Sequence, residues 1–198
     1  MCRVGILGGT FDPPHYGHLI IAEEARVACQ LDEVWFMPSH IPPHKKRADL
    51  SSNEDRVEMV RLAISDHDSF HITKIELERE GPSYTVDTMK QLTNMYPTYH
   101  FHFIIGGDMI DYLPKWHGIE ELLELVTFIG LKRPGYPSHS PYQEKIIEIG
   151  APQLEISSSE IRKRTATERN TRYMLPDVVR AYVKERDLYG KKCSSRDG

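Results

Sequence analysis

The sequence predicts a doubly wound α/β protein, with a mainly parallel sheet and helices on both of its faces. Short apolar runs alternate with helical stretches along the 198 residues, and such alternation is typical of repeated β-α-β units. The first run, Val4 to Leu7, breaks at Gly8-Gly9 and passes into a helix with periodic apolar positions from Leu19. The run Glu33 to Pro38 completes one β-α-β unit, which implies parallel strands and a right-handed crossover.

The remaining elements follow in order, each with its own local signal. A capping box at Ser51 to Glu54 opens a helix, Ser83 or Thr85 is the candidate cap of the next one, and Pro176 fits a first helical position. Strands are predicted over residues 70–77, 99–105, 126–131 and 153–156, and helices over residues 51–66, from 83–88 onward, 119–125, after 157–159 and 177–186. The sheet should therefore hold about five or six strands, followed by a small helical part over residues 157–189.

Composition limits the class of protein. Charged residues make up 27% and hydrophobic residues 39% of the chain, which suits one globular domain over residues 1–189 with a disordered polar tail at 190–198. There is no bilayer-length apolar run and no signal-peptide pattern, and Cys2, Cys29 and Cys193 lack metal or redox spacing. We expect a cytoplasmic protein without a membrane partner. A net charge of -4 argues against nucleic-acid binding.

One stretch combines several features of an anion site. Gly8-Gly9 let the backbone approach a ligand, and the helix that follows presents unpaired N–H groups in its first turn. His15 and His18 add side-chain donors at the same place. The two histidines also have the spacing of a metal pair, but no other Cys or His cluster supplies the remaining ligands of a closed zinc site. Phosphate chemistry is the first hypothesis.

Further candidates lie just beyond predicted strands, where ligands of open α/β sheets bind. Lys45, in a loop with two adjacent prolines, is placed to contact phosphate, and Asp108 is placed to accept hydrogen bonds from a ribose. Ser157 and Ser158 open a second helix whose N-terminus suits phosphate. Trp116 fits either core packing or stacking on a flat heterocycle.

Two motifs carry a resemblance to a known family. Residues 8–18 read G-G-T-F-D-P-P-H-Y-G-H, and residues 156–162 read I-S-S-S-E-I-R. The first resembles the signature of nucleotidyltransferases with an H-x-G-H motif, and its long form resembles bacterial nicotinate-nucleotide adenylyltransferases in particular. The second resembles that family's I-S-S-T-x-x-R, with Ser159 at the position usually held by threonine. The resemblance covers the chain from about Val4 to Tyr189.

The resemblance implies a Rossmann-like fold and an activity in NAD biosynthesis. That activity is adenylyl transfer from ATP, accompanied by Mg²⁺, to nicotinate mononucleotide, and the products are deamido-NAD and pyrophosphate. The resemblance implies catalytic roles for His15, His18 and Arg162. It implies ATP contacts at Gly8, Gly9, Thr10, Phe11, His18, Gly106, Asp108, Arg133, Ile156, Ser157, Ser158 and Arg162, and mononucleotide contacts at Gly9, Thr10, His15, Lys45, Ser83, Tyr84, Thr85 and Trp116. We expect no metal held by protein ligands alone. Whether the protein forms a homodimer is left open by the sequence.

Three alternatives are weighed against this assignment. Pantetheine-phosphate adenylyltransferase shares the H-x-G-H motif, but the extra length, the segment Ser83 to Thr88 and Trp116 argue against it. Nicotinamide mononucleotide is a rival substrate, although backbone amides at a helix start favour a carboxylate. A regulatory protein that only binds nucleotides would not require His15, His18 and Arg162 together.

Overall fold

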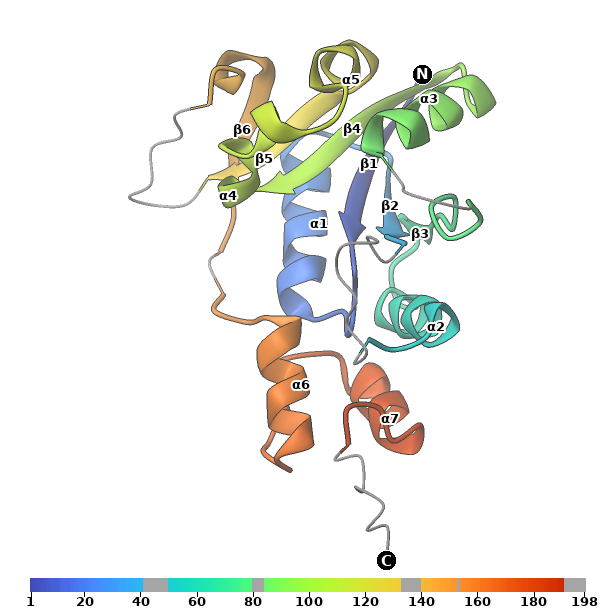
Figure 1. The fold of residues 1–198 in the computed structure, drawn as a ribbon, viewed down its shortest axis with the longest axis vertical. Helices are drawn as coiled ribbons and strands as arrows, with labels where there is room; N and C mark the ends of the chain where they lie inside the picture. The colour runs from blue at the N-terminus through green and yellow to red at the C-terminus, as the bar shows by residue number, and fades with distance from the viewer. Residues whose placement is uncertain (41–49, 80–83, 133–139, 153, 191–198) are drawn as a thin grey trace, which may run out of the picture.

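The protein is described here from a computed structural model, which describes residues 1–40, 50–79, 84–132, 140–152 and 154–190. Six parallel strands form one sheet in the order β3-β2-β1-β4-β5-β6 (Figure 1). This is the strand order of a Rossmann-like fold, which confirms the predicted fold class. The direction of winding reverses between β1 and β4, and ligands of such sheets bind outside the carboxyl ends of the strands at that point.

The boundaries of the elements are as follows. The strands are β1 (Cys2–Gly9), β2 (Glu33–Pro38), β3 (Phe70–Ile72), β4 (Tyr99–Gly106), β5 (Thr127–Lys132) and β6 (Ile146–Gly150). The α-helices are α1 (Tyr16–Ala28), α2 (Asn53–Ala63), α3 (Thr85–Met95), α4 (Gly107–Ile110), α5 (Ile119–Leu125), α6 (Ser158–Ala166) and α7 (Asp177–Glu185). Short 3-10 turns lie at Leu113–Lys115 and Gln143–Lys145.

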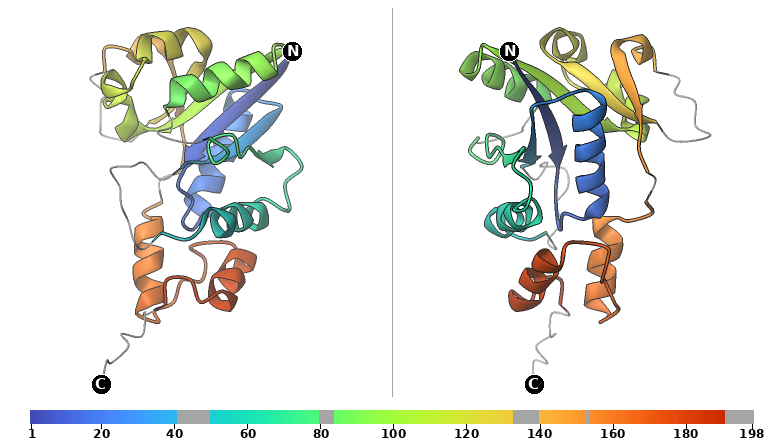
Figure 2. Two further views of the ribbon diagram at one scale, coloured as in Figure 1. Left: turned by 45° about the vertical axis from the view of Figure 1, so that its right-hand side comes forward. Right: turned by 180° about the vertical axis from the view of Figure 1, so that it is seen from behind.

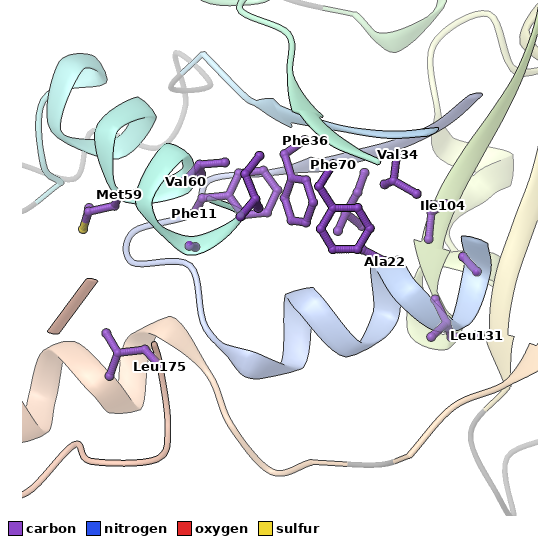
Figure 3. Close-up of a cluster of buried hydrophobic side chains, with 14 of the residues drawn as sticks. Phe11, Ala22, Val34, Phe36, Met59, Val60, Phe70, Ile104, Leu131 and Leu175 are labelled. Carbon is purple, nitrogen blue, oxygen red and sulfur yellow. The ribbon is translucent and has the colours of Figure 1, made fainter. Parts of the chain in front are cut away.

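Each face of the sheet has its own hydrophobic core. On β4, Phe103 contributes to the core under α3 and α5, whereas its neighbour Ile104 contributes to the core under α1 and α2. Figure 3 shows the second core, in which Phe11, from the loop after β1, lies beside Phe36. Because central strands are buried on both faces, they appear in the sequence as continuous apolar runs rather than as alternating ones.

Two strand predictions were wrong in extent or position. The strand expected over residues 70–77 ends at Ile72, because the N–H groups of Leu77 and Glu78 bond to the Lys74 carbonyl within a turn instead of to a neighbouring strand. No strand occupies the described residues 154–156. The last strand is instead Ile146–Gly150, which pairs along β5 from Phe128 to Lys132.

Several helix ends also differ from the prediction. The cap of α2 is Ser52 rather than Ser51, with Ser52 Oγ accepting from Asp55 N–H at 3.0 Å, and α2 ends at Ala63 rather than near residue 66. Thr85 is the first residue of α3 and not its cap, which is Tyr84. Pro176 is the N-cap of α7 rather than its first residue. Val27, one of the apolar residues of α1, is 60% exposed because it lies on the face away from Ala22 and Ala25.

The last two helices lie at the carboxyl ends of the strands. Figures 1 and 2 show α6 and α7 below the sheet, at the opposite end of the molecule from the N-terminus. Helix α7 docks on α2 through Asp55, which accepts hydrogen bonds from Tyr182 Oη at 2.8 Å and from Arg186 Nε at 3.3 Å. After α6, the chain therefore returns to the carboxyl end of β1. The predicted domain limits of 1–189 stay a prediction, and residues 191–198 lie outside the described residues.

Candidate active site

The segment after β1 forms a buried loop at the carboxyl edge of the sheet. Gly8 and Thr10 are exposed, whereas residues 11–15 are all buried. Phe11 adopts a positive φ of 50°, a conformation that is uncommon for a residue with a side chain and recurs at functional sites. The loop leads directly into α1, whose N-cap is His15, so it carries the first sequence motif at the reversal point of the sheet.

His15 and His18 lie against each other at the start of α1. Their rings are stacked, with centroids 3.8 Å apart and planes 28° apart. His18 Nδ1 accepts a hydrogen bond from the His15 backbone N–H at 3.2 Å. Since Nδ1 acts as an acceptor, a neutral His18 carries its proton on Nε2 and can donate it there.

Both imidazoles are neutral near pH 7. Burial lowers the pKa of His15 to about 4, and burial together with the nearby charge of a protonated His15 lowers the pKa of His18 well below its ordinary value. Among the described residues, buried His15 Nδ1 has no hydrogen-bond partner. An unpaired buried polar atom of this kind is typical of a group that forms its hydrogen bond with a bound ligand.

At two positions of the first motif, a side chain larger than that of glycine would collide with a neighbouring ring. A Cβ on Gly17 would lie 3.0 Å from His15 Cε1 and Nδ1, and a Cβ on Gly9 would lie 3.0 Å from the Phe11 ring. The Phe11 ring in turn packs edge-on against His18, with centroids 5.0 Å apart. Both glycines therefore set how closely the histidine pair packs.

The second motif docks onto this loop. Ser157 caps α6, with its Oγ accepting from Glu160 N–H at 3.2 Å. Ser158 Oγ donates to the Pro13 carbonyl at 2.8 Å, and Arg162 donates from Nη1 to the Asp12 carbonyl at 2.6 Å and from Nη2 to Ser159 Oγ at 3.2 Å. The two motifs, predicted from separate ends of the sequence, are therefore in direct contact.

A cavity of about 220 Å³ opens beside the histidines. One part of its wall comes from His15, Gly17 and His18 at the start of α1 and from Gly106 and Gly107 after β4, and the other part is mainly apolar and comes from Ile21, Leu131, Ala151, Pro152, Leu154 and Ile156. A wall that is polar on one part and apolar on another suits a ligand that joins phosphates to a flat aromatic base. The predicted residues Gly106 and Ile156 are thus brought to the histidines.

Other predicted contacts lie elsewhere or cannot be described. Tyr84, Thr85 and Trp116 do not line this cavity. Half-buried Trp116 packs edge-on against Phe103 and Phe128, with centroids 5.8 and 6.1 Å away, so it contributes to core packing while part of its surface stays exposed. Lys45, Ser83, Arg133 and the side chain of Asp108 lie outside the described part of the chain.

The start of α3, where Tyr84 and Thr85 lie, is held in place by hydrogen bonds of a buried side chain. Thr88, fully buried, donates to the Tyr84 carbonyl at 3.3 Å and to Glu76 Oε1 at 3.4 Å. Burial raises the pKa of Glu76 above its ordinary value. The Tyr84 ring lies 4.4 Å from the ring of His117, centroid to centroid.

Sequence reasoning missed the charged residues beneath the loop. Arg56 is fully buried and donates from Nη1 to the carbonyls of Thr10 and Ser39, each at 2.9 Å. Asp12 is also fully buried and accepts from Tyr189 Oη at 2.5 Å. The spacing of Arg56 to the buried residues Met59 and Val60 puts it on the inner face of α2, and this was the signal available in the sequence.

Metal-binding clusters and membrane-spanning helices are both absent from the described residues. No group of three or more His, Cys, Asp or Glu side chains there is arranged to hold a metal ion. None of the helices in the same residues has both the length and the apolarity to cross a bilayer.

Comparisons with known proteins agree with this geometry. The family model for cytidylyltransferase-like proteins matches residues 6–164. A protein of Geobacillus thermodenitrificans described as a probable nicotinate-nucleotide adenylyltransferase is 54% identical over 197 residues, covering 100% of this chain and 90% of the relative. A protein of Bacillus cytotoxicus with the same description is 53% identical over 189 residues, covering 96% and 99%.

The fold is shared with a solved structure as well. Plasmodium falciparum nicotinic acid mononucleotide adenylyltransferase, complexed with NaAD, superposes with a TM-score of 0.81 at 23% identity, covering 96% of this chain and 98% of that one. At this identity the likeness concerns the fold alone. With the matching family model and the identity to the Geobacillus and Bacillus relatives, the chain belongs to the nicotinate-nucleotide adenylyltransferase family of cytidylyltransferase-like proteins.

Proposed function

We propose that the protein transfers the adenylyl group of ATP to nicotinate mononucleotide, giving deamido-NAD (nicotinate adenine dinucleotide) and pyrophosphate. The observation that carries the proposal is the contact between the two motifs, in which Arg162 reaches the Asp12 carbonyl across 150 positions of the chain. The contact brings a cation and the first turn of α6 to the same loop as His15 and His18. These groups match the charge of a triphosphate.

The chemistry needs no covalent nucleophile on the protein. A phosphate oxygen of the mononucleotide attacks the α-phosphorus of ATP in line, the new P–O bond forms, and the bond from the α-phosphorus to the bridging oxygen breaks as pyrophosphate leaves. The attacking phosphate is already an anion near pH 7, so the protein contributes positioning and stabilisation of charge. The reaction balances without an added oxidant, reductant or base.

The histidines act as neutral donors in this proposal. His18 donates from Nε2, since its Nδ1 is held by the His15 N–H. His15, whose pKa is lowered to about 4 by burial, likewise contributes an N–H rather than a positive charge. Neutral donors stabilise developing charge on the phosphates without the desolvation penalty of a buried imidazolium.

The remaining ATP contacts are proposed in the cavity and in the two motifs that meet beside it. Arg162, Ser157 and Ser158 hold the leaving phosphates, and the backbone from Gly8 to Phe11 cradles the reacting groups. The apolar part of the wall, which includes Ile156 and Leu131, accepts the adenine. Asp108, which follows β4, binds the ribose of ATP. Arg133, which follows β5, lies near ATP and contacts it.

The mononucleotide site is proposed at the start of α3. Thr85 is the first residue of this 11-residue helix, so its neighbouring backbone N–H groups suit a carboxylate. Tyr84 and Ser83 flank it, Trp116 stacks on the pyridine ring, and Lys45 contacts a phosphate. Gly9, Thr10 and His15 complete the contacts to the mononucleotide.

A divalent metal accompanies ATP in adenylyl transfer by this family, and we propose that it is Mg²⁺. The metal supplies charge neutralisation on the triphosphate, with ATP oxygens and water as its main ligands. We also propose a cytoplasmic location and leave the homodimer as a prediction that sedimentation of the purified protein would test.

Measuring pyrophosphate release with ATP and Mg²⁺ tests the function. We expect kcat/KM for nicotinate mononucleotide to exceed that for nicotinamide mononucleotide by about 100-fold or more, equivalent to about 2.7 kcal/mol. Similar values for acid and amide would keep the reaction but remove the carboxylate contact at Thr85. Release with phosphopantetheine alone, or with none of the three acceptors, would overturn the substrate assignment.

Replacing Gly17 by alanine is expected to lower kcat about 10- to 100-fold, because a misplacement of reacting groups by less than an ångström is costly. The new Cβ would lie 3.0 Å from the His15 ring, which is buried and stacked on His18. Gly150→Ala is the control, because a Cβ there meets nothing within 4 Å. Equal activity of the two variants would contradict a steric requirement at Gly17.

A further inference from the structure

The end of the described chain reaches back to the active-site loop. Tyr189 Oη donates to Asp12 Oδ1 at 2.5 Å, and the two residues are separated by 177 positions in the chain. The half-buried ring of Tyr189 lies over α2, where Oη is also 3.8 Å from Met59 Sδ. Tyr189 has a positive φ of 65°, an uncommon backbone conformation that the surrounding contacts must hold in place.

Asp12 connects Tyr189 to the active site. Its carboxylate is fully buried, so it depends on the groups around it for solvation. These groups are the Tyr189 hydroxyl, the Ser51 N–H at 3.4 Å and the guanidinium of Arg56, which interacts with it electrostatically. Burial and the charge of Asp12 raise the pKa of Tyr189, so the hydroxyl stays protonated and acts as a donor.

The backbone of the same residue holds the second motif. The Asp12 carbonyl accepts from Arg162 at 2.6 Å, and the next carbonyl, of Pro13, accepts from Ser158 at 2.8 Å. A shift of Asp12 would therefore displace Arg162, and through Pro13 and Pro14 it would also displace His15. The hydroxyl of Tyr189 bonds to Asp12 and lies near Met59 and Ser51, none of which lines the cavity, and it also interacts electrostatically with Arg162. The bond to Asp12 is therefore its direct link to the active-site loop.

We propose that Tyr189 is a positioning residue for adenylyl transfer: its hydroxyl, bonded to the buried Asp12 carboxylate, fixes the loop that carries His15 and anchors Arg162. The inference rests on the proposed function. The contact also ties the turn after α7 to the loop after β1, so that the catalytic geometry depends on a segment outside both motifs.

Tyr189→Phe tests this, because it removes the hydroxyl and keeps the ring. We expect kcat at saturating ATP and nicotinate mononucleotide to fall about 10-fold, with both KM values changed less than about 3-fold. This split distinguishes positioning from partial unfolding, which would lower the active fraction but leave the turnover of each remaining folded molecule unchanged. Turnover is therefore expressed per folded molecule, counted by circular dichroism at the assay temperature.

The matched control is Tyr182→Phe. Tyr182 makes the same kind of bond, from its hydroxyl to the carboxylate of Asp55 at 2.8 Å, and it also ties the C-terminal part of the chain to α2. The hydrogen bonds of Asp55 in the described residues go to Ser52, Tyr182 and Arg186 and not to residues 10–15. We therefore expect a similar loss of thermal stability with kcat within about 2-fold of the wild type.

A double-mutant cycle gives a second, independent readout of the contact. In an Asp12→Asn background, adding Tyr189→Phe is expected to lower kcat less than about 2-fold further, since the two residues act through one contact. Equal kcat for the wild type and Tyr189→Phe, or additive losses in the double variant, would overturn the role of Tyr189. Turnover of the wild type decides the proposed function separately, because the role of Tyr189 is read from ratios between variants.

Discussion

Replacing His18 by alanine is expected to lower kcat for pyrophosphate release about 10²- to 10³-fold, the usual loss when a single preorganised donor to a charged transition state is removed. His18 is held from two sides, by the stacked His15 ring at 3.8 Å and by the edge-on Phe11 ring at 5.0 Å. Its Nδ1 is occupied by the His15 N–H, so Nε2–H is the donor that the variant loses.

The His18→Asn variant separates this role from a structural one. The asparagine oxygen can accept from the His15 N–H as Nδ1 does, which preserves the N-terminal geometry of α1, but asparagine does not reach the position of Nε2. We expect Asn to restore thermal stability relative to Ala while kcat stays as low. Near-wild-type turnover by either folded variant would contradict a catalytic role for His18.

The pKa values make the size of this loss insensitive to pH. Burial lowers the pKa of both imidazoles, that of His15 to about 4, so in the free protein neither gains a proton between about pH 6 and about pH 8. The ratio of wild-type to His18→Ala kcat/KM is therefore expected to stay constant over that range. A ratio that grows as the pH falls through 6.5 would mean that the imidazolium is the active form.

The fold could be predicted from the sequence because the central strands are buried on both faces. Tyr99–Gly106 and Glu33–Pro38 appear as apolar runs of strand length, and the helices between them have clear starting signals. The edge strands β3 and β6 were misjudged, since their limits depend on a neighbour: β3 pairs only along Val34 to Phe36. Nothing in an isolated stretch of sequence marks where a neighbouring strand stops.

The candidate site was predictable where residues lie in one short motif, and less so where the fold joins distant parts. His15 and His18 were identified by their chemistry beside the glycine pair, and the family resemblance of the two motifs added Ser158 and Arg162; the structure brings all four to one loop. Tyr189 was not identified, because its contact with Asp12 joins residues far apart in the chain and depends on the packing of α7 on α2. A tyrosine near the end of a chain has no local pattern that reveals such a partner.

Arg162 is the residue in which the two motifs meet, and replacing it by lysine is expected to lower kcat about 100-fold with a raised KM for ATP. The guanidinium donates to the Asp12 carbonyl at 2.6 Å and to Ser159 Oγ at 3.2 Å, and with five N–H groups it has donors left for the leaving phosphates. Lysine keeps the charge but lacks the planar fork, so it cannot hold the loop and a phosphate at the same time.

The control is Arg164→Lys, two positions along the same helix. Arg164 pairs with Glu160 at 2.8 Å on the surface of α6, a pair of a kind that contributes little to stability, and we expect its kcat within about 2-fold of the wild type. The comparison is made by steady-state pyrophosphate release with ATP and nicotinate mononucleotide varied in turn. If Arg162→Lys changed neither kcat nor the KM for ATP by more than about 2-fold, Arg162 would be an anchor for the loop alone. A raised KM for ATP with an unchanged KM for the mononucleotide would instead assign its remaining N–H groups to the triphosphate, because only the ligand that it contacts loses binding energy.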